Sequence, residues 1–131
     1  MTPEELSDFV SALPGATEEQ PFGPDVDVFK VGGKNFALLS PEPPGSISLK
    51  CEPEWAVELR ELYDAVGPGY HLNKRHWNTI TLDASIPDEV LVSMVTHSYD
   101  RVVVGLPKSL RPGWAGGTSP SAEVPFSDRG P

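Results

Sequence analysis

The sequence predicts a single two-layer α+β domain in which three helices and five short strands follow the order α-β-β-β-α-β-β-α. Two patterns predict this class. Some segments place apolar residues at helical spacing, whereas others alternate polar and apolar residues as half-buried strands do. Turns rich in glycine and proline separate successive strands, so we expect one antiparallel five-stranded sheet. Its helices would cover one face and leave the other partly open to solvent or a partner.

The first helix is expected to begin directly after Thr2. This residue can cap the helix, Pro3 fits the first helical position, and Glu5 completes a capping box. The apolar residues that follow recur at i, i+3, i+4 and i+7 and form one face: Leu6, Phe9, Val10 and Leu13. Pro14 and Gly15 end the helix.

Three strands are expected in the first half of the chain, after an acidic loop at 15–25. They are expected at 25–31, 35–39 and 46–50, where apolar residues alternate with polar ones. Gly32 and Gly33 form a two-residue turn of the kind that closes a hairpin. The first two strands are therefore predicted to pair as a β-hairpin.

A second helix is expected to begin at Pro53. Its apolar residues share one side of the helix: Trp55, Leu59, Leu62, Tyr63 and Val66. Cys51 and Glu52 stand where a Ser or Thr cap is commoner, so we expect this helix to be poorly capped. The Gly-Pro-Gly run at 67–69 ends it.

Two strands and a third helix are expected next. A short strand is expected at 70–72, and a strand with several β-branched residues at 77–82. The helix is expected to begin after a capping arrangement at 85–88 and to run to about Gly105. Three basic residues at or beyond its end suit the helix dipole: Arg101, Lys108 and Arg111.

The domain is expected to span residues 1–111. From residue 112 to residue 131 the composition changes to proline, glycine and serine. Such a segment buries too little apolar surface to fold, so we expect a disordered tail there. The chain carries no internal repeat.

The charge balance bears on the kind of partner. Nineteen acidic and ten basic residues give a net charge of −9, whereas proteins that bind nucleic acid usually present a basic face. The charges are unevenly distributed, however. Residues 65–82 and 28–41 contain no acidic residue. This uneven distribution allows a neutral-to-basic surface patch on a protein that is acidic overall.

Several protein classes are excluded by composition. No apolar run is long enough to span a bilayer, and the acidic start lacks the basic residues and apolar stretch of a signal peptide. We therefore expect a soluble cytoplasmic protein that does not associate with membranes. The single cysteine, Cys51, excludes an internal disulfide and fits a reducing compartment.

One motif resembles a known family. The string His-Leu-Asn-Lys-Arg-His-Trp at 71–77, followed by a β-branched strand, is similar to the MmcQ/YjbR-like family. Further similarity lies in Leu-Pro-Gly-Ala at 13–16, in the hairpin sequence at 28–37 and in Ile-Ser-Leu-Lys at 47–50. The resemblance covers about residues 1–111.

This resemblance carries its own expectations. It implies an α+β fold with a five-stranded antiparallel sheet and three helices, which agrees with the order of elements above. It also implies a bacterial DNA-binding protein with a "double-wing" arrangement, no established enzyme activity and no cofactor. The net charge of −9 departs from the DNA-binding expectation.

Nine residues are candidate nucleic-acid contacts: Lys30, Lys34, Lys50, His71, Asn73, Lys74, Arg75, His76 and Trp77. Turn residues among them could contact phosphates or base edges, while Trp77 could stack on a base. Lys74 and Arg75 are the candidates with the least structural role. The lysines beside the Gly-Gly turn could act as a wing along a nucleic-acid backbone.

The same residues also have a structural interpretation. Asn73 could adopt a left-handed turn conformation, His71 and His76 could cap backbone groups, and Trp77 could belong to the core. Lys30 and Lys34 could be solvated charges that protect an edge strand.

The sequence bears on three other functions, namely catalysis, metal binding and protein interaction. Cys51 has no local signature of a nucleophile, and the histidines lack the close spacing of a zinc site, so neither catalysis nor a metal is expected. A protein-interaction domain is the alternative to DNA binding. In that case an acidic surface, the open sheet face or a sheet edge would bind a peptide or a partner protein.

Overall fold

The computed structural model describes residues 1–113, and the tail predicted for 112–131 falls almost entirely outside them. Three α-helices, six strands and one 3₁₀ helix follow one another along these residues. Their bounds are α1 Pro3–Ser11, β1 Thr17–Glu19, β2 Asp27–Val31, β3 Lys34–Ser40, β4 Ser46–Lys50, α2 Pro53–Leu62, β5 Val66–Pro68, β6 Trp77–Thr81, α3 Asp88–Val104 and η1 Lys108–Leu110.

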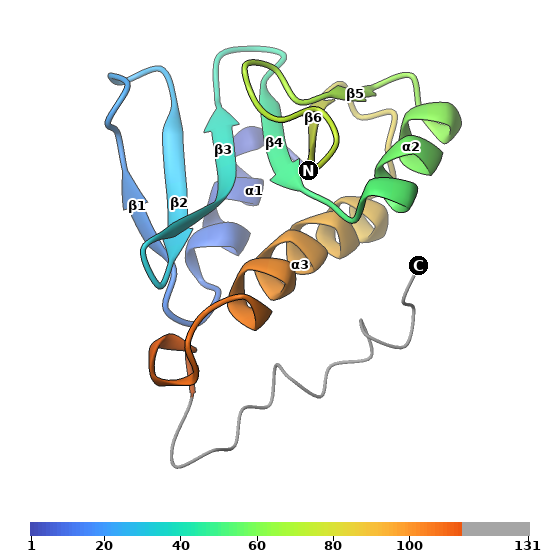
Figure 1. Cartoon of the computed structure of the whole chain (residues 1–131). Helices are drawn as coiled ribbons and strands as arrows, with labels where there is room; N and C mark the ends of the chain where they lie inside the picture. Colours follow the sequence, from blue (N-terminus) through green and yellow to red (C-terminus); the bar gives the residue numbers. More distant parts are fainter. Residues whose placement is uncertain (114–131) are drawn as a thin grey trace.

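The strands form one antiparallel sheet in the order β1-β2-β3-β4-β6-β5. Helices α1 and α3 pack on the central strands, and α2 lies beside β5 at one end of the sheet (Figure 1). The α+β class and the three helices predicted from the sequence are therefore confirmed. Within residues 1–113, no helix combines the length and apolar character that a membrane span needs.

The prediction of five strands was wrong, because the sheet has six. The additional strand, β1, lies in the segment expected to be an acidic loop. Its three residues are all exposed, so no alternation of apolar side chains marks it in the sequence. It forms the outer edge of the sheet, where it pairs only with β2.

The end of α2 and the strand after it also differ from the prediction. Helix α2 ends at Leu62, four residues before the expected end, because Tyr63 is already extended. The short strand lies at Val66–Pro68 instead of 70–72. The glycine and proline that suggested only a helix stop belong to this edge strand, a position where proline is tolerated.

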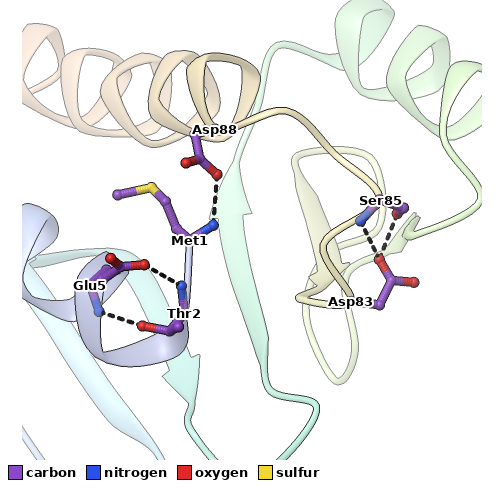
Figure 2. Close-up of polar contacts among 6 residues, drawn as sticks. All are labelled: Met1, Thr2, Glu5, Asp83, Ser85 and Asp88. Atoms are coloured by element: carbon purple, nitrogen blue, oxygen red, sulfur yellow. Dashed lines mark hydrogen bonds and ion pairs between the residues drawn. The ribbon is translucent and has the colours of Figure 1, made fainter.

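Two helix starts also differ from the prediction. Glu52 caps α2 well, since its carboxylate accepts hydrogen bonds from the backbone N–H groups of Glu54 and Trp55. Conversely, α3 begins after Pro87 without a side-chain cap. The expected capping residue, Ser85, hydrogen-bonds to Asp83 instead (Figure 2).

The start of α1 is as predicted, and it is tied to α3. Thr2 and Glu5 form the capping box, each side chain accepting a hydrogen bond from the other residue's backbone N–H (Figure 2). The N-terminal ammonium of Met1 lies 2.6 Å from a carboxylate oxygen of Asp88, in the first turn of α3. The ion pair therefore fixes the first helix against the third.

The register of the sheet separates a core face from a second face. On β3, β4 and β6 the residues that pair on the core face are almost completely buried: Ala37, Leu39, Ile47, Leu49 and Ile80. Side chains alternate along a strand, so Ser48, Lys50, Trp77 and Thr79 lie on the opposite face. There the hydroxyls of Ser48 and Thr79 are hydrogen-bonded at 2.8 Å.

The β2–β3 hairpin is confirmed in detail. Gly32 and Gly33 have φ values of 57° and 80°, which suit a two-residue turn between strands of right-handed twist. A bulge follows at the start of β3, so that Phe36 and Ala37 are both fully buried. The turn packs against the end of α3, because a Cβ added at Gly32 would lie 2.5 Å from Leu106.

Candidate functional site

A hollow of about 430 Å³ lies where four elements meet: the β2–β3 turn, the end of β4, the start of β6 and the last turns of α3. Its polar and aromatic lining comes from Lys34, Asn35, Lys50, Trp77 and Arg101. The remaining walls are Gly33 and three residues at the end of α3. We call this site the basic hollow.

The charge of the basic hollow is of one sign. Lys34, Lys50 and Arg101 line it, and no acidic residue does. The Arg101 Nε atom is buried and makes no hydrogen bond within residues 1–113. The Nε atom is closed to solvent and hence to a ligand in the hollow, so Arg101 contributes its positive charge, which together with Lys34 and Lys50 attracts an anion. The site is therefore suited to a phosphate or a carboxylate.

Ser98 fixes the two strands and the helix that form the hollow. This serine is completely buried, and its hydroxyl donates to the Phe36 carbonyl oxygen at 2.6 Å. It also accepts from the Lys50 backbone N–H at 2.9 Å. Since Ser98 precedes Arg101 by one helical turn, the same contacts position Arg101 relative to Lys50.

Cys51 lies beside this site but is not reactive. Burial raises the pKa of its thiol to about 12, and the positive charge of Arg101 opposes that rise only in part. At neutral pH it stays protonated, and the thiolate is the reactive form. Within residues 1–113 no group of three His, Cys, Asp or Glu side chains is arranged to hold a metal ion.

The structure brings together three of the nine predicted contact residues, namely Lys34, Lys50 and Trp77. Trp77 is half-buried and pairs with Lys50 across the β4–β6 ladder. Lys30 does not line the hollow. Its ammonium lies 3.3 Å from a carboxylate oxygen of Glu19, so it joins the edge strand β1 to β2.

The other five predicted residues form the turn between β5 and β6, which we call the 71–76 turn. The Asn73 side-chain oxygen accepts from the backbone N–H groups of Arg75 and His76, at 2.9 and 3.3 Å. The Lys74 ammonium donates to the Gly69 carbonyl oxygen at 3.1 Å. These bonds agree with the structural interpretation, although the left-handed residue is His71, at φ 58°, and not Asn73.

Arg75 lies in a different place from the basic hollow. It lines a second hollow of about 430 Å³ on α2, together with Pro53, Glu54, Val57 and Arg60. The guanidinium of Arg60 is already engaged. Its Nε donates to the buried Asn78 side-chain oxygen at 2.7 Å, and its Nη2 donates to the Lys74 carbonyl oxygen. The second hollow therefore has a carboxylate in its lining and a cation that supports the fold.

Arg101 lines the basic hollow but is not among the nine candidate contacts named from the sequence. It was explained by the helix dipole alone, although it sits in the mainly apolar final turns of α3. A signal was available in the sequence: the polar residues His97, Ser98, Asp100 and Arg101 stand in a helix whose other residues from position 90 onward are mainly apolar. Polar groups in such a stretch need specific partners, which marks them for closer inspection.

A family model and the curated relatives of this chain point to the same family. The family model described as YjbR matches residues 11–101. The uncharacterized protein YbdF of Escherichia coli O157:H7 is 40% identical over 99 residues, which cover 71% of this chain and 80% of that protein. The uncharacterized protein YjbR of Escherichia coli K12 is 38% identical over 112 residues, covering 85% of this chain and 95% of that protein.

Solved structures share the fold. The crystal structure of Deinococcus radiodurans protein DR2400 is similar with a TM-score of 0.79 and 36% identity, covering 90% of this chain and 94% of that chain. A crystal structure of a protein from Pseudomonas syringae is similar with a TM-score of 0.67 and 26% identity, covering 75% of this chain and 96% of that one.

Proposed function

This chain belongs to the YjbR family, and we propose that it is a DNA-binding protein whose phosphate contacts lie in the basic hollow. It would act by binding and not by catalysis, in the reducing cytoplasm where Cys51 stays a thiol. The observation that supports the proposal is that Lys34, Lys50 and Arg101 line one hollow to which no acidic residue contributes.

The chemistry of phosphate recognition supports this choice of ligand. A guanidinium presents donors in a fork that matches two phosphate oxygens, and lysines add positive charge without fixing the geometry. Lys34 stands directly after the β2–β3 turn and Lys50 at the end of β4, so two strands and a helix supply the three cations. The hairpin turn would serve as one wing along the backbone.

The net charge of −9 is compatible with such a site. Acidic side chains concentrate elsewhere, on β1, on the N-terminal turns of α1 and α3, and on α2. A charged surface acts on a ligand mainly within about 8–10 Å at physiological salt. The local charge of the basic hollow therefore governs the contact, while the distant acids weaken non-specific association.

The test is fluorescence anisotropy of labelled DNA, presented both as a duplex and as a single strand. With about three phosphate contacts, affinity should fall roughly 40-fold for a duplex between 50 and 200 mM salt. The variant Lys34→Glu, Lys50→Glu should lose more than tenfold in affinity. It should also lower the salt slope by about two, because two phosphate contacts are removed.

The matched control is Lys74→Glu, Arg75→Glu, which makes the same change of net charge in the 71–76 turn. It should retain most of the affinity if the hollow is the site. Equal loss in both variants would mean that overall charge alone drives binding, and loss only in the control would move the site to the turn. Absence of binding at low salt in the wild type would overturn the proposal.

A second candidate function rests on strand β1. This edge strand is exposed along its whole length and acidic, and Phe22, just beyond it, is 69% exposed. An extended basic peptide could add to such an edge through backbone hydrogen bonds. A labelled basic peptide in the same anisotropy assay tests it. Binding that survives Lys34→Glu, Lys50→Glu but is lost in Glu18→Pro, which breaks the edge, would favour this function.

A further inference from the structure

We propose that the basic hollow accepts one nucleotide of a single strand, with the base against Trp77 and the phosphate against Arg101, so that this protein prefers single-stranded nucleic acid to a duplex. This rests on the proposed function and adds the form of the ligand. Two observations carry it: the shape of the site and the place of Trp77 in its wall.

The first observation is concavity. The hollow is an open depression of about 430 Å³, within the range of roughly 300–1,000 Å³ that small-molecule sites occupy. A duplex presents a convex surface, and its bases are stacked on both sides, so a base must leave the stack before a pocket can receive it. Bases of a single strand are already available. The dimensions therefore suit one unpaired nucleotide.

The second observation is that the fold holds Trp77 against this wall. Trp77 lies between Lys50 on β4 and Gly69, whose backbone N–H donates to the Trp77 carbonyl oxygen at 2.9 Å. A Cβ at position 69 would lie 2.7 Å from the Trp77 Cβ. Glycine thus allows the chain after β5 to pack closely against the backbone and Cβ of Trp77. The backbone of Trp77 is held on two sides, and stacking on its half-buried side chain would tolerate any base.

The polar lining is arranged around this indole. Lys50 is the cross-strand neighbour of Trp77, and Arg101 of α3 lines the same hollow. Asn35, at the start of β3, adds an amide that can hydrogen-bond to a base edge. An aromatic surface between cations is the combination that single-stranded nucleic-acid sites use for base and backbone.

The experiment measures the affinity of the full chain for a single-stranded oligodeoxynucleotide of about ten nucleotides and for the duplex of the same sequence, by anisotropy at one salt concentration. The single strand should bind at least tenfold more tightly. Trp77→Ala should reduce single-strand affinity roughly tenfold or more, since one base loses its stacking partner. Trp77→Phe should restore most of it, and Trp77→Leu, which keeps apolar bulk without an aromatic ring, should lose affinity as alanine does and serves if the alanine variant does not fold.

Tyr70→Ala is the matched aromatic control. Tyr70 is 71% exposed, contacts His71 and does not line the hollow. Its removal should leave the preference for single strands unchanged. A loss in Tyr70→Ala but not in Trp77→Ala would overturn the inference, because the stacking surface would then be at the turn.

The two proposals fail in different ways. Equal affinity for single strand and duplex, with both reduced by Lys34→Glu, Lys50→Glu, would overturn the single-strand preference and leave the proposed function standing. Binding of neither form would overturn both. A single-strand preference that is unchanged in both Trp77→Ala and Trp77→Leu would overturn the place given to Trp77.

Discussion

The basic hollow and the 71–76 turn both contain cationic residues that were candidates from the sequence, but their charged side chains have different surroundings in the structure. In the turn, Lys74 donates to the Gly69 carbonyl oxygen and Arg60 reaches in from α2 to the Lys74 carbonyl oxygen. In the hollow, the Arg101 Nε has no hydrogen-bond partner within residues 1–113. One region uses its donors to hold the chain together, whereas the other contains a buried donor that the fold leaves unsatisfied.

This difference shows why a run of basic residues is a weak guide to a binding site. The string at 71–77 is the most recognisable motif in the sequence, yet Asn73 and Lys74 both make hydrogen bonds within the turn. The motif therefore builds a turn in this protein. The cations of the hollow come from three separate segments of the chain, so no short string contains them.

The largest expected effect is a difference in stability between a variant of Arg60 and the same variant of Arg101. Arg60→Leu removes hydrogen bonds to Asn78, Lys74 and Trp77 and leaves the buried Asn78 oxygen without its donor. We expect the free energy of unfolding to fall by about 2–3 kcal/mol. Arg101→Leu should change it by less than about 1 kcal/mol, because it removes a donor that is unsatisfied in the fold. Urea denaturation followed by circular dichroism measures both.

These two variants carry identical substitutions on α-helices, so helix propensity and charge change cancel in the comparison. A large loss of stability in Arg101→Leu would show that its guanidinium supports the fold. The distinction between the two regions would then be lost, and the support that Arg101 gives to the proposed function would be lost with it.

A smaller effect is expected at Asn73. The change Asn73→Ala removes the side-chain oxygen that accepts from the Arg75 and His76 N–H groups, and we expect a loss of about 1 kcal/mol. DNA affinity should stay within twofold of wild type. A thermal melt and the anisotropy assay check the two statements, and a strong loss of affinity without a loss of stability would return Asn73 to the binding surface.

The smallest effect at neutral pH concerns Cys51, which lies near both arginines. Burial raises the pKa of its thiol from 9.0 to about 12 in the folded protein. A raised pKa stabilises the fold fully below the unfolded value and loses that contribution as pH rises toward the folded value. Stability should therefore be insensitive to this group at pH 7 and should decline between about pH 9 and pH 12.

Denaturation at several pH values measures this decline, and Cys51→Ala is the control. The part of the decline that belongs to the thiol should be absent from the alanine variant. Burial also raises the pKa of Tyr99 to about 12, so a residual decline is expected in both proteins. Identical profiles in the two proteins would contradict the burial effect assigned to Cys51.

Much of the fold could be predicted because local chemistry decides it. The capping box at Thr2 and Glu5, the Gly32–Gly33 turn and the alternation along β2, β3, β4 and β6 are written in short stretches of sequence. The strands that were missed or misplaced are edge strands of three residues. These hold their conformation through hydrogen bonds to a neighbour and not through an apolar pattern of their own.

The candidate site was predicted only in part. Lys34, Lys50 and Trp77 were named from the sequence, but their convergence depends on the β4–β6 register and on the bulged start of β3. Arg101 joins them because Ser98, one turn earlier, bonds to the backbone of both strands. Residues 34, 50, 77 and 101 are too far apart along the chain for their spacing to reveal that they meet in the fold.

By itself, then, the sequence determined the α+β class, the three helices, the hairpin and the acidic overall charge, since these follow from local periodicity and composition. Tertiary structure alone decided which cationic side chains find hydrogen-bond partners within residues 1–113. Whether a charged group is satisfied depends on the carbonyl and carboxylate oxygens that the fold brings within hydrogen-bonding distance. For Lys74 and Arg60 the fold supplies such oxygens, and for the Arg101 Nε it supplies none within residues 1–113.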